Sequence, residues 1–126
     1  MAEGSTPGLP PALRPDQLPA LRAAFSDEVS ARVGPLHEAA ALLAESGDLE
    51  AARVVSRHAH VFATSAVILG EELASYQARR CEVLLEPFLA GSQPVPDDVA
   101  TQAAEAAETL GVLLAPWVLK VADDAD

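Results

Sequence analysis

Apolar side chains recur at steps of three and four residues along four segments of this chain, and this spacing predicts amphipathic helices. No alternation with a period of two, which would indicate strands, extends beyond a few residues. Helices with short connections bury their apolar faces most readily against one another, so we expect an all-α, antiparallel up-down four-helix bundle. The four apolar stripes are Phe25, Val29, Val33, Leu36, Ala40 and Leu43; Val55, Ala59, Phe62, Ala66 and Leu69; Leu73, Ala74, Ala78, Cys81, Leu85 and Phe88; and Val99, Ala103, Ala106, Leu110 and Leu113 or Leu114.

Residues that start and stop helices mark the boundaries of the first two segments. Asp16 is suited to cap the first helix, and Gly47 is suited to end it. Gly34-Pro35 interrupts this helix and predicts a bend, because proline removes a backbone donor inside a helix. Asp48 can cap the second helix, and Gly70 predicts a break after it.

The third and fourth segments have similar signals. The third helix is expected to begin near Glu71 and to kink or end at Pro87. Residues 91–96 (GSQPVP) form a predicted loop. Asp97 or Asp98 then begins the fourth helix, since an acidic side chain is favoured at a helix N-terminus.

The ends of the chain are expected to lie outside the bundle. Residues 1–15 are rich in Pro, Gly and Ser and predict a disordered tail or linker. Pro116 is expected to end the fourth helix, and a short extra C-terminal helix is expected within residues 116–121. We therefore assign the bundle to residues 16–122 and an acidic tail to residues 123–126.

Composition limits the classes of function. Half of the 126 residues are hydrophobic but only 4% are aromatic, so the core must consist mainly of Ala, Leu and Val. The net charge of -11 argues against nucleic-acid binding, because phosphates would be repelled by most of the surface. No apolar run approaches the roughly 20 residues that span a bilayer, and residues 1–15 lack the apolar core of a secretion signal. We expect a cytoplasmic protein that does not interact with membranes.

The sequence indicates neither a resident cofactor nor a metal. Cys81 is the single cysteine and is expected to be a small core residue, and no Cys/His set has zinc-ligand spacing. There is no glycine-rich phosphate loop, and no spacing typical of a Ser/His/Asp triad or of paired catalytic carboxylates. The histidines His37, His58 and His60 are therefore the principal candidates for chemistry.

His60 is the most informative of the three histidines. At 100° per residue it lies away from the apolar stripe of the second helix and should be exposed in mid-helix. His58 lies about 200° from it and should be half-buried between helices, whereas His37 has no evident partner. The face that His60 shares is formed by Arg53, Ser56, Arg57, Ala63, Thr64 and Val67.

The run from Ala59 to Ala74 resembles the signature of histidine phosphotransfer (HPt) domains. That family has an Ala-His pair followed by apolar, Ser, Ala, Leu-Gly and Leu positions, and the resemblance extends over residues 21–74. Two positions differ: the family's Lys three residues after the histidine is Ala63 here, and the following Gly is Thr64. The matching residues are Ala59, His60, Phe62, Ser65, Ala66, Leu69, Gly70 and Leu73.

The resemblance implies a phosphocarrier in a two-component phosphorelay, with His60 as the phosphoryl acceptor. Its partners would be a response-regulator receiver domain, a histidine kinase or both, with Mg²⁺ on the receiver only. Arg53 or Arg57 would replace the missing Lys. Thr64 would either hydrogen-bond the imidazole or the phosphoryl group, or obstruct docking, and Val67 would provide apolar docking area for the partner. The protein is expected to be a monomer. The alternative is a degenerate HPt-like adaptor, which binds a receiver or kinase domain without carrying phosphate.

Overall fold

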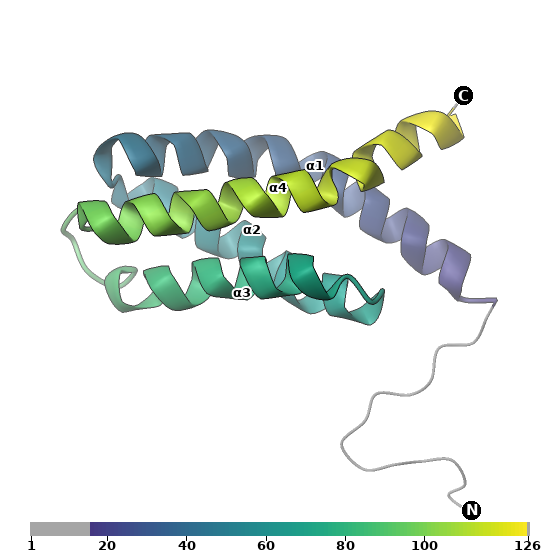
Figure 1. Ribbon diagram of the computed structural model, residues 1–126, viewed down its shortest axis with the longest axis horizontal. Coiled ribbons are helices and arrows are strands. Elements are labelled where there is room, and N and C mark those ends of the chain that lie inside the picture. The colour runs from purple at the N-terminus through teal and green to yellow at the C-terminus, as the bar shows by residue number, and fades with distance from the viewer. Residues whose placement is uncertain (1–15, 126) are drawn as a thin grey trace, which may run out of the picture.

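The computed structural model describes residues 16–125, of which residues 119–125 are described as backbone only. This part of the chain is helical apart from its turns and contains no strand (Figure 1). The predicted all-α fold is therefore confirmed. The elements are α1 (Leu18–Ser46), α2 (Leu49–Ile68), α3 (Glu72–Leu85), the single 3₁₀ turn η1 (Glu86–Phe88) and α4 (Asp97–Ala125).

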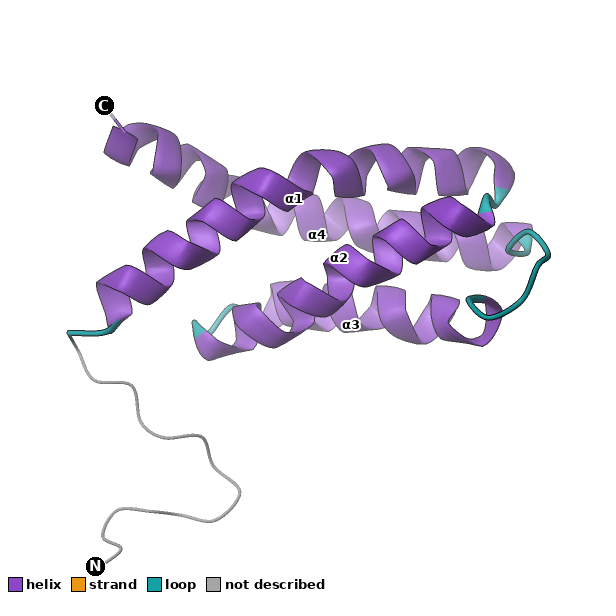
Figure 2. Ribbon diagram, turned by 180° about the vertical axis from the view of Figure 1, so that it is seen from behind, coloured by secondary structure: helices purple, strands orange, loops and turns teal. Residues whose placement is uncertain are grey.

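The helices form an antiparallel bundle in which consecutive helices are neighbours. α1 packs against α2 and α4, and α3 packs against the same two helices, so α1 and α3 occupy opposite corners. α1 and α4 are the two long helices, and they extend past α2 and α3 at one end of the bundle (Figures 1 and 2). The shorter pair, α2 and α3, consequently forms a hairpin with one face open to solvent.

The core of the bundle is built mainly from alanine. Within residues 16–118, fourteen of the 26 buried apolar residues are alanines, as the low aromatic content predicts. Three aromatic rings fill the space that these small side chains leave. Phe25 makes edge-to-face contacts with Phe62 and Trp117, at centroid distances of 6.3 and 4.7 Å, and so connects α1 with α2 and α4.

The turn between α1 and α2 depends on the residue type at two positions. Gly47 adopts the left-handed conformation (φ 68°) and its N–H donates to Leu43 O, so it ends α1 as predicted. Its carbonyl accepts a 2.8 Å hydrogen bond from Val95 N, and an added Cβ would lie 2.4 Å from Val95 O. Asp48 caps α2 as predicted, because its carboxylate accepts a 2.8 Å hydrogen bond from Ala51 N.

Several predicted features of the hairpin and the following loop are also confirmed. Gly70 has φ 77° and follows the end of α2, so the predicted break is present. α3 ends at Leu85, directly before the 3₁₀ turn that contains Pro87. Pro35 lies inside a continuous α1, which changes direction about halfway along its length (Figure 2).

Other boundary predictions are wrong. Gln17, not Asp16, occupies the N-cap position of α1. Pro116 does not end α4, which continues to Ala125, so there is no separate C-terminal helix within the described residues. The helix thus also includes residues 123–125 of the predicted acidic tail. The predicted N-terminal tail (1–15) lies outside the described residues.

One predicted core residue is also misplaced. Leu73 is 68% exposed, although it was expected to be buried. The buried stripe of α3 runs through Ala74, Ala78, Cys81 and Leu85, and Leu73 lies about 100° away from Ala74 around the helix. Its side chain therefore belongs to the open face of the hairpin.

Candidate functional site

His60 lies in the middle of α2 with its side chain 73% exposed, as its place outside the apolar stripe predicts. Its Nδ1 atom lies 2.8 Å from Oε1 of Glu82 on α3. Glu82 is only 24% exposed, so the carboxylate is more sheltered from water than the imidazole. The contact joins the two helices of the hairpin at the edge of the bundle.

The Glu82 contact determines which ring nitrogen of His60 carries the proton. An ionised carboxylate can only accept hydrogen bonds, so Nδ1 must be the donor. In a neutral imidazole the lone pair then resides on Nε2, which has no hydrogen-bond partner among residues 16–125. The arrangement leaves one exposed, unprotonated nitrogen that can act as a nucleophile.

Neither the apolar stripes nor the motif around His60 indicated Glu82. It lies 22 positions after the histidine and reaches it only because α2 and α3 pack antiparallel in one register. A second contact fixes the same register, since Ser75 Oγ donates a 2.8 Å hydrogen bond to Ala63 O. The signal that could have found Glu82 is the seven-residue spacing from Ser75, which puts both side chains on one edge of α3.

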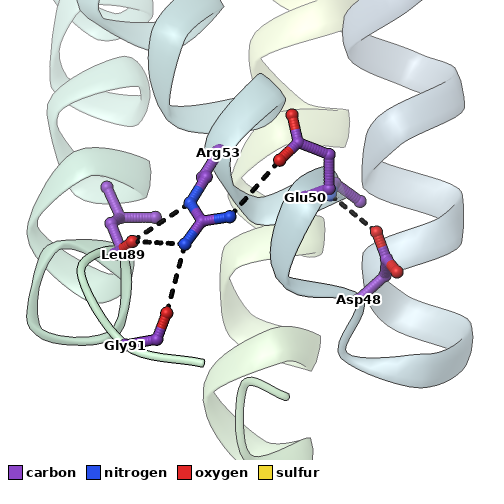
Figure 3. Close-up of polar contacts among 6 residues, drawn as sticks. Asp48, Glu50, Arg53, Leu89 and Gly91 are labelled. Carbon is purple, nitrogen blue, oxygen red and sulfur yellow. Dashed lines mark hydrogen bonds and ion pairs between the residues drawn. The ribbon is translucent and has the colours of Figure 1, made fainter. Parts of the chain in front are cut away.

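Arg53 does not serve the His60 site. Its guanidinium donates to Leu89 O at 3.1 and 3.0 Å and to Gly91 O at 3.1 Å, and it forms an ion pair with Glu50 at 3.3 Å (Figure 3). These bonds satisfy carbonyl groups after η1, where the chain leaves the third helix. The predicted role of Arg53 as a phosphoryl-binding cation is therefore not favoured by its position.

The other predicted neighbours on α2 are exposed, except for the half-buried Ser56 and the buried Ala63. Arg57 is exposed and forms no ion pair within the described chain. Thr64 is exposed, but its hydroxyl donates to His60 O (3.2 Å) and not to the imidazole. Val67 is 54% exposed.

Ala63 is only 3% exposed. The prediction that it lies on the open face with His60 is wrong, because α3 packs over this position and Ser75 bonds to its carbonyl. A lysine at this position would have to extend its side chain out from between two helices.

His58 occupies a different environment on the opposite side of α2. It is half-buried against α1, as expected, and its Nδ1 lies 3.0 Å from Nη1 of Arg32. Because a guanidinium cannot accept a hydrogen bond, Nδ1 must be the acceptor and the ring is neutral. Burial, with smaller contributions from Arg32 and Arg57, lowers the pKa of His58 from its ordinary value. This histidine is held by the structure and offers no exposed nucleophile.

The hairpin of α2 and α3 differs in charge from the rest of the molecule. Residues 49–85 contain four acidic residues (Glu50, Glu71, Glu72 and Glu82) and four basic ones (Arg53, Arg57, Arg79 and Arg80), so their net charge is zero. The remaining residues then carry the entire charge of -11. An anionic group or an acidic protein surface meets less repulsion at the hairpin than elsewhere.

The single cysteine is not a second candidate centre for chemistry. Cys81 is fully buried, as expected, and burial raises the pKa of its thiol to about 12, so it is unreactive. Within residues 16–125, no group of three or more His, Cys, Asp or Glu side chains could hold a metal ion. Nor does this part of the chain include a helix with the length and apolar character needed to cross a membrane.

Comparison with family models, curated proteins and solved structures finds no match to this chain. The functional argument therefore depends on the geometry around His60.

Proposed function

We propose that this protein is a histidine-containing phosphotransfer protein that carries a phosphoryl group on His60. The observation that carries the proposal is the exposed imidazole in mid-helix, with Nδ1 bonded to Glu82 and Nε2 open to solvent. Phosphoryl transfer needs an aligned nucleophile and stabilisation of negative charge, and demands little further covalent chemistry of the carrier. A lone, oriented histidine on a rigid helix meets the first requirement.

The reaction would proceed at Nε2. In transfer from an aspartyl phosphate of a receiver domain, the Nε2 lone pair forms the N–P bond as the P–O bond breaks, and the aspartate leaves as a carboxylate. The ring keeps its Nδ1 proton and becomes positively charged. Glu82 would stabilise this charge through the same hydrogen bond that orients the ring. Transfer to a receiver aspartate is the reverse of these steps.

The partner would dock on the open face of the α2–α3 hairpin. Among the residues whose side chains the structure describes, eight large apolar residues are exposed, and five of them lie between positions 67 and 83, in the hairpin whose net charge is zero. Receiver domains hold Mg²⁺ with carboxylates at their phosphorylation site, and the net charge of zero on this hairpin would tolerate them. The five residues are Val67, Ile68, Leu73, Tyr76 and Val83.

On this proposal the protein acts in the cytoplasm as a monomer, and its partners are a receiver domain, a histidine kinase or both. Mg²⁺ belongs to the receiver. The carrier needs no cofactor of its own.

The direct test is incubation with phosphoramidate, a small phosphodonor, followed by intact-mass analysis. We expect one phosphoryl group on the wild-type protein and none on His60→Gln. His37→Gln is the matched control, because it removes an exposed histidine on α1 and should leave the uptake unchanged. Equal uptake by wild type and His60→Gln would refute the proposal.

A phosphorylated receiver domain provides the second arm of the test and separates the carrier from the adaptor alternative. Transfer to His60 supports the carrier. Binding of the receiver to the hairpin face without transfer, together with no uptake from phosphoramidate, identifies a degenerate adaptor.

A further inference from the structure

We propose that Arg79 of α3, acting with Arg57 of α2, binds the phosphoryl group on His60; this inference rests on the proposed function. The sequence motif suggested cations only on the helix that carries the histidine. The structure instead draws attention to the neighbouring helix, where Arg79 lies at the edge that meets α2.

The position of Arg79 follows from two contacts on either side of it. Ser75 bonds to Ala63 O on α2, and Glu82 bonds to the imidazole of His60. Arg79 is four residues after Ser75 and three before Glu82, so all three lie along one edge of α3. Since both flanking residues touch α2, Arg79 must lie beside the same stretch of α2, which contains His60.

Arg79 is also available to bind a ligand. It is exposed, and it forms no hydrogen bond or ion pair within residues 16–125. Arg57, one turn before His60, has the same property. Arg53, by contrast, is occupied by the carbonyls of Leu89 and Gly91, and Ala63 is buried.

A guanidinium group suits this role because its planar N–H donors match the geometry of phosphoryl oxygens. With Glu82 holding Nδ1, a phosphoryl group would be carried on Nε2, the other nitrogen of an exposed ring. Arg57, one turn before His60 on α2, and Arg79, on the edge of α3 that meets α2, would reach that position from opposite helices. Two arginines would therefore replace the single lysine that the motif lacks.

The test compares Arg79→Gln with Arg80→Gln. Both variants remove one positive charge from α3, but Arg80 lies about 100° further around the helix, off the edge defined by Ser75 and Glu82. With phosphoramidate as donor, we expect phosphohistidine to form about tenfold more slowly in Arg79→Gln, and at the wild-type rate in Arg80→Gln. Arg79→Lys, which keeps the charge, should recover part of the loss. Equal rates for Arg79→Gln and Arg80→Gln would overturn the inference while leaving His60 as the carrier.

A second readout does not require covalent transfer. Inorganic phosphate is titrated into the unphosphorylated protein while the ring resonances of His60 are followed by NMR. We expect phosphate to shift these resonances in wild type and in Arg80→Gln at similar phosphate concentrations. In Arg79→Gln, the same shift should require a several-fold higher phosphate concentration. If wild type binds phosphate in this way but gains none from any donor, the proposed function fails and the anion site stands. Identical titrations of the two variants contradict the anion site.

Discussion

At the scale of single residues, the two histidines of α2 are held by partners of opposite charge. Arg32 donates to Nδ1 of His58, whereas Glu82 accepts from Nδ1 of His60. The first contact leaves a neutral ring half-buried against α1, and the second leaves an exposed Nε2 with a free lone pair. Two histidines that are only two positions apart are thus suited to different roles, one in packing and one in chemistry.

Removal of the Glu82 carboxylate should slow phosphorylation. Glu82→Ala loses both the hydrogen bond that orients the ring and the charge that stabilises the imidazolium, so we expect a decrease of about tenfold or more in the rate with phosphoramidate. Glu82→Gln keeps an acceptor oxygen, so its phosphorylation rate should lie between the rates of wild type and Glu82→Ala. The ring ¹⁵N shifts of His60 should also show a loss of the Nδ1–H tautomer in Glu82→Ala.

Glu72→Gln is the matched control for Glu82, because Glu72 is exposed on the same helix and makes no hydrogen bond within the described part of the chain. Glu72→Gln should keep the wild-type phosphorylation rate and the wild-type tautomer of His60. An unchanged tautomer and rate in Glu82→Ala would show that the carboxylate does not position the ring.

At the scale of helices, the contact between α1 and α2 should be sensitive to pH through His58. Its pKa is lowered in the folded state, so below the ordinary value of 6.5 the unfolded chain binds more protons than the folded protein. The stabilisation is therefore complete above pH 6.5 and is lost as the pH falls through the lower, folded-state pKa. Urea unfolding followed by Trp117 fluorescence measures this change.

The variant His58→Asn keeps a neutral acceptor near Arg32 but does not titrate, so its stability should fall less steeply below pH 6.5. His37→Asn removes an exposed histidine and should keep the wild-type slope. If His58→Asn and wild type lose stability in parallel, His58 does not cause the pH dependence.

The turn between α1 and α2 gives a second prediction at this scale. Gly47→Ala places a Cβ 2.4 Å from Val95 O and forces a left-handed conformation on alanine, so it should lower the free energy of unfolding by at least about 1–2 kcal/mol. Gly111→Ala, inside α4 where a Cβ meets no atom within 4 Å, should raise it by about 0.5–1 kcal/mol. Changes of the same sign in the two variants, measured by urea unfolding, would contradict this account of the turn.

Helix boundaries could be predicted from the sequence where a local interaction decides them. Asp48 and Gly47 act through hydrogen bonds within a few residues, so their effect is visible in the sequence. The prediction that Pro116 ends α4 is wrong because a proline ends a helix only if tertiary packing does not hold the chain helical on both sides. Here the next residue, Trp117, is buried against Phe25 and supports continuation of α4.

At the scale of the whole molecule, an alanine-rich core depends on a few large side chains to connect its helices. Phe62 is fully buried and contacts Phe25 edge-to-face. Phe62→Ala should therefore cost about 3–5 kcal/mol of unfolding free energy, which is a large part of the stability of a small domain. Loss of far-UV circular dichroism in urea measures this cost.

Tyr76→Ala is the matched control, since it truncates an aromatic ring that is 60% exposed on α3. Its effect should stay within about 0.5 kcal/mol. Similar costs for the two variants would mean that the aromatic contacts do not hold the bundle together.

The candidate site could be predicted only in part from the sequence, for reasons that belong to the whole molecule. The exposure of His60 follows from helical periodicity in one segment, so it was predictable. The positions of Glu82 and Arg79 beside it depend on the register between α2 and α3, and the burial of Ala63 depends on how closely α3 packs. The occupation of Arg53 by the loop after η1 also arises from contacts distant in sequence.

The central claim is that Nε2 of His60 accepts a phosphoryl group while Nδ1 keeps its proton. The most direct measurement is ¹⁵N–³¹P correlated NMR of ¹⁵N-labelled protein after incubation with phosphoramidate. We predict a single phosphorus coupled to Nε2 of His60, with the proton on Nδ1. Phosphorus coupled to Nδ1, attached to another residue, or absent from the protein would contradict the account.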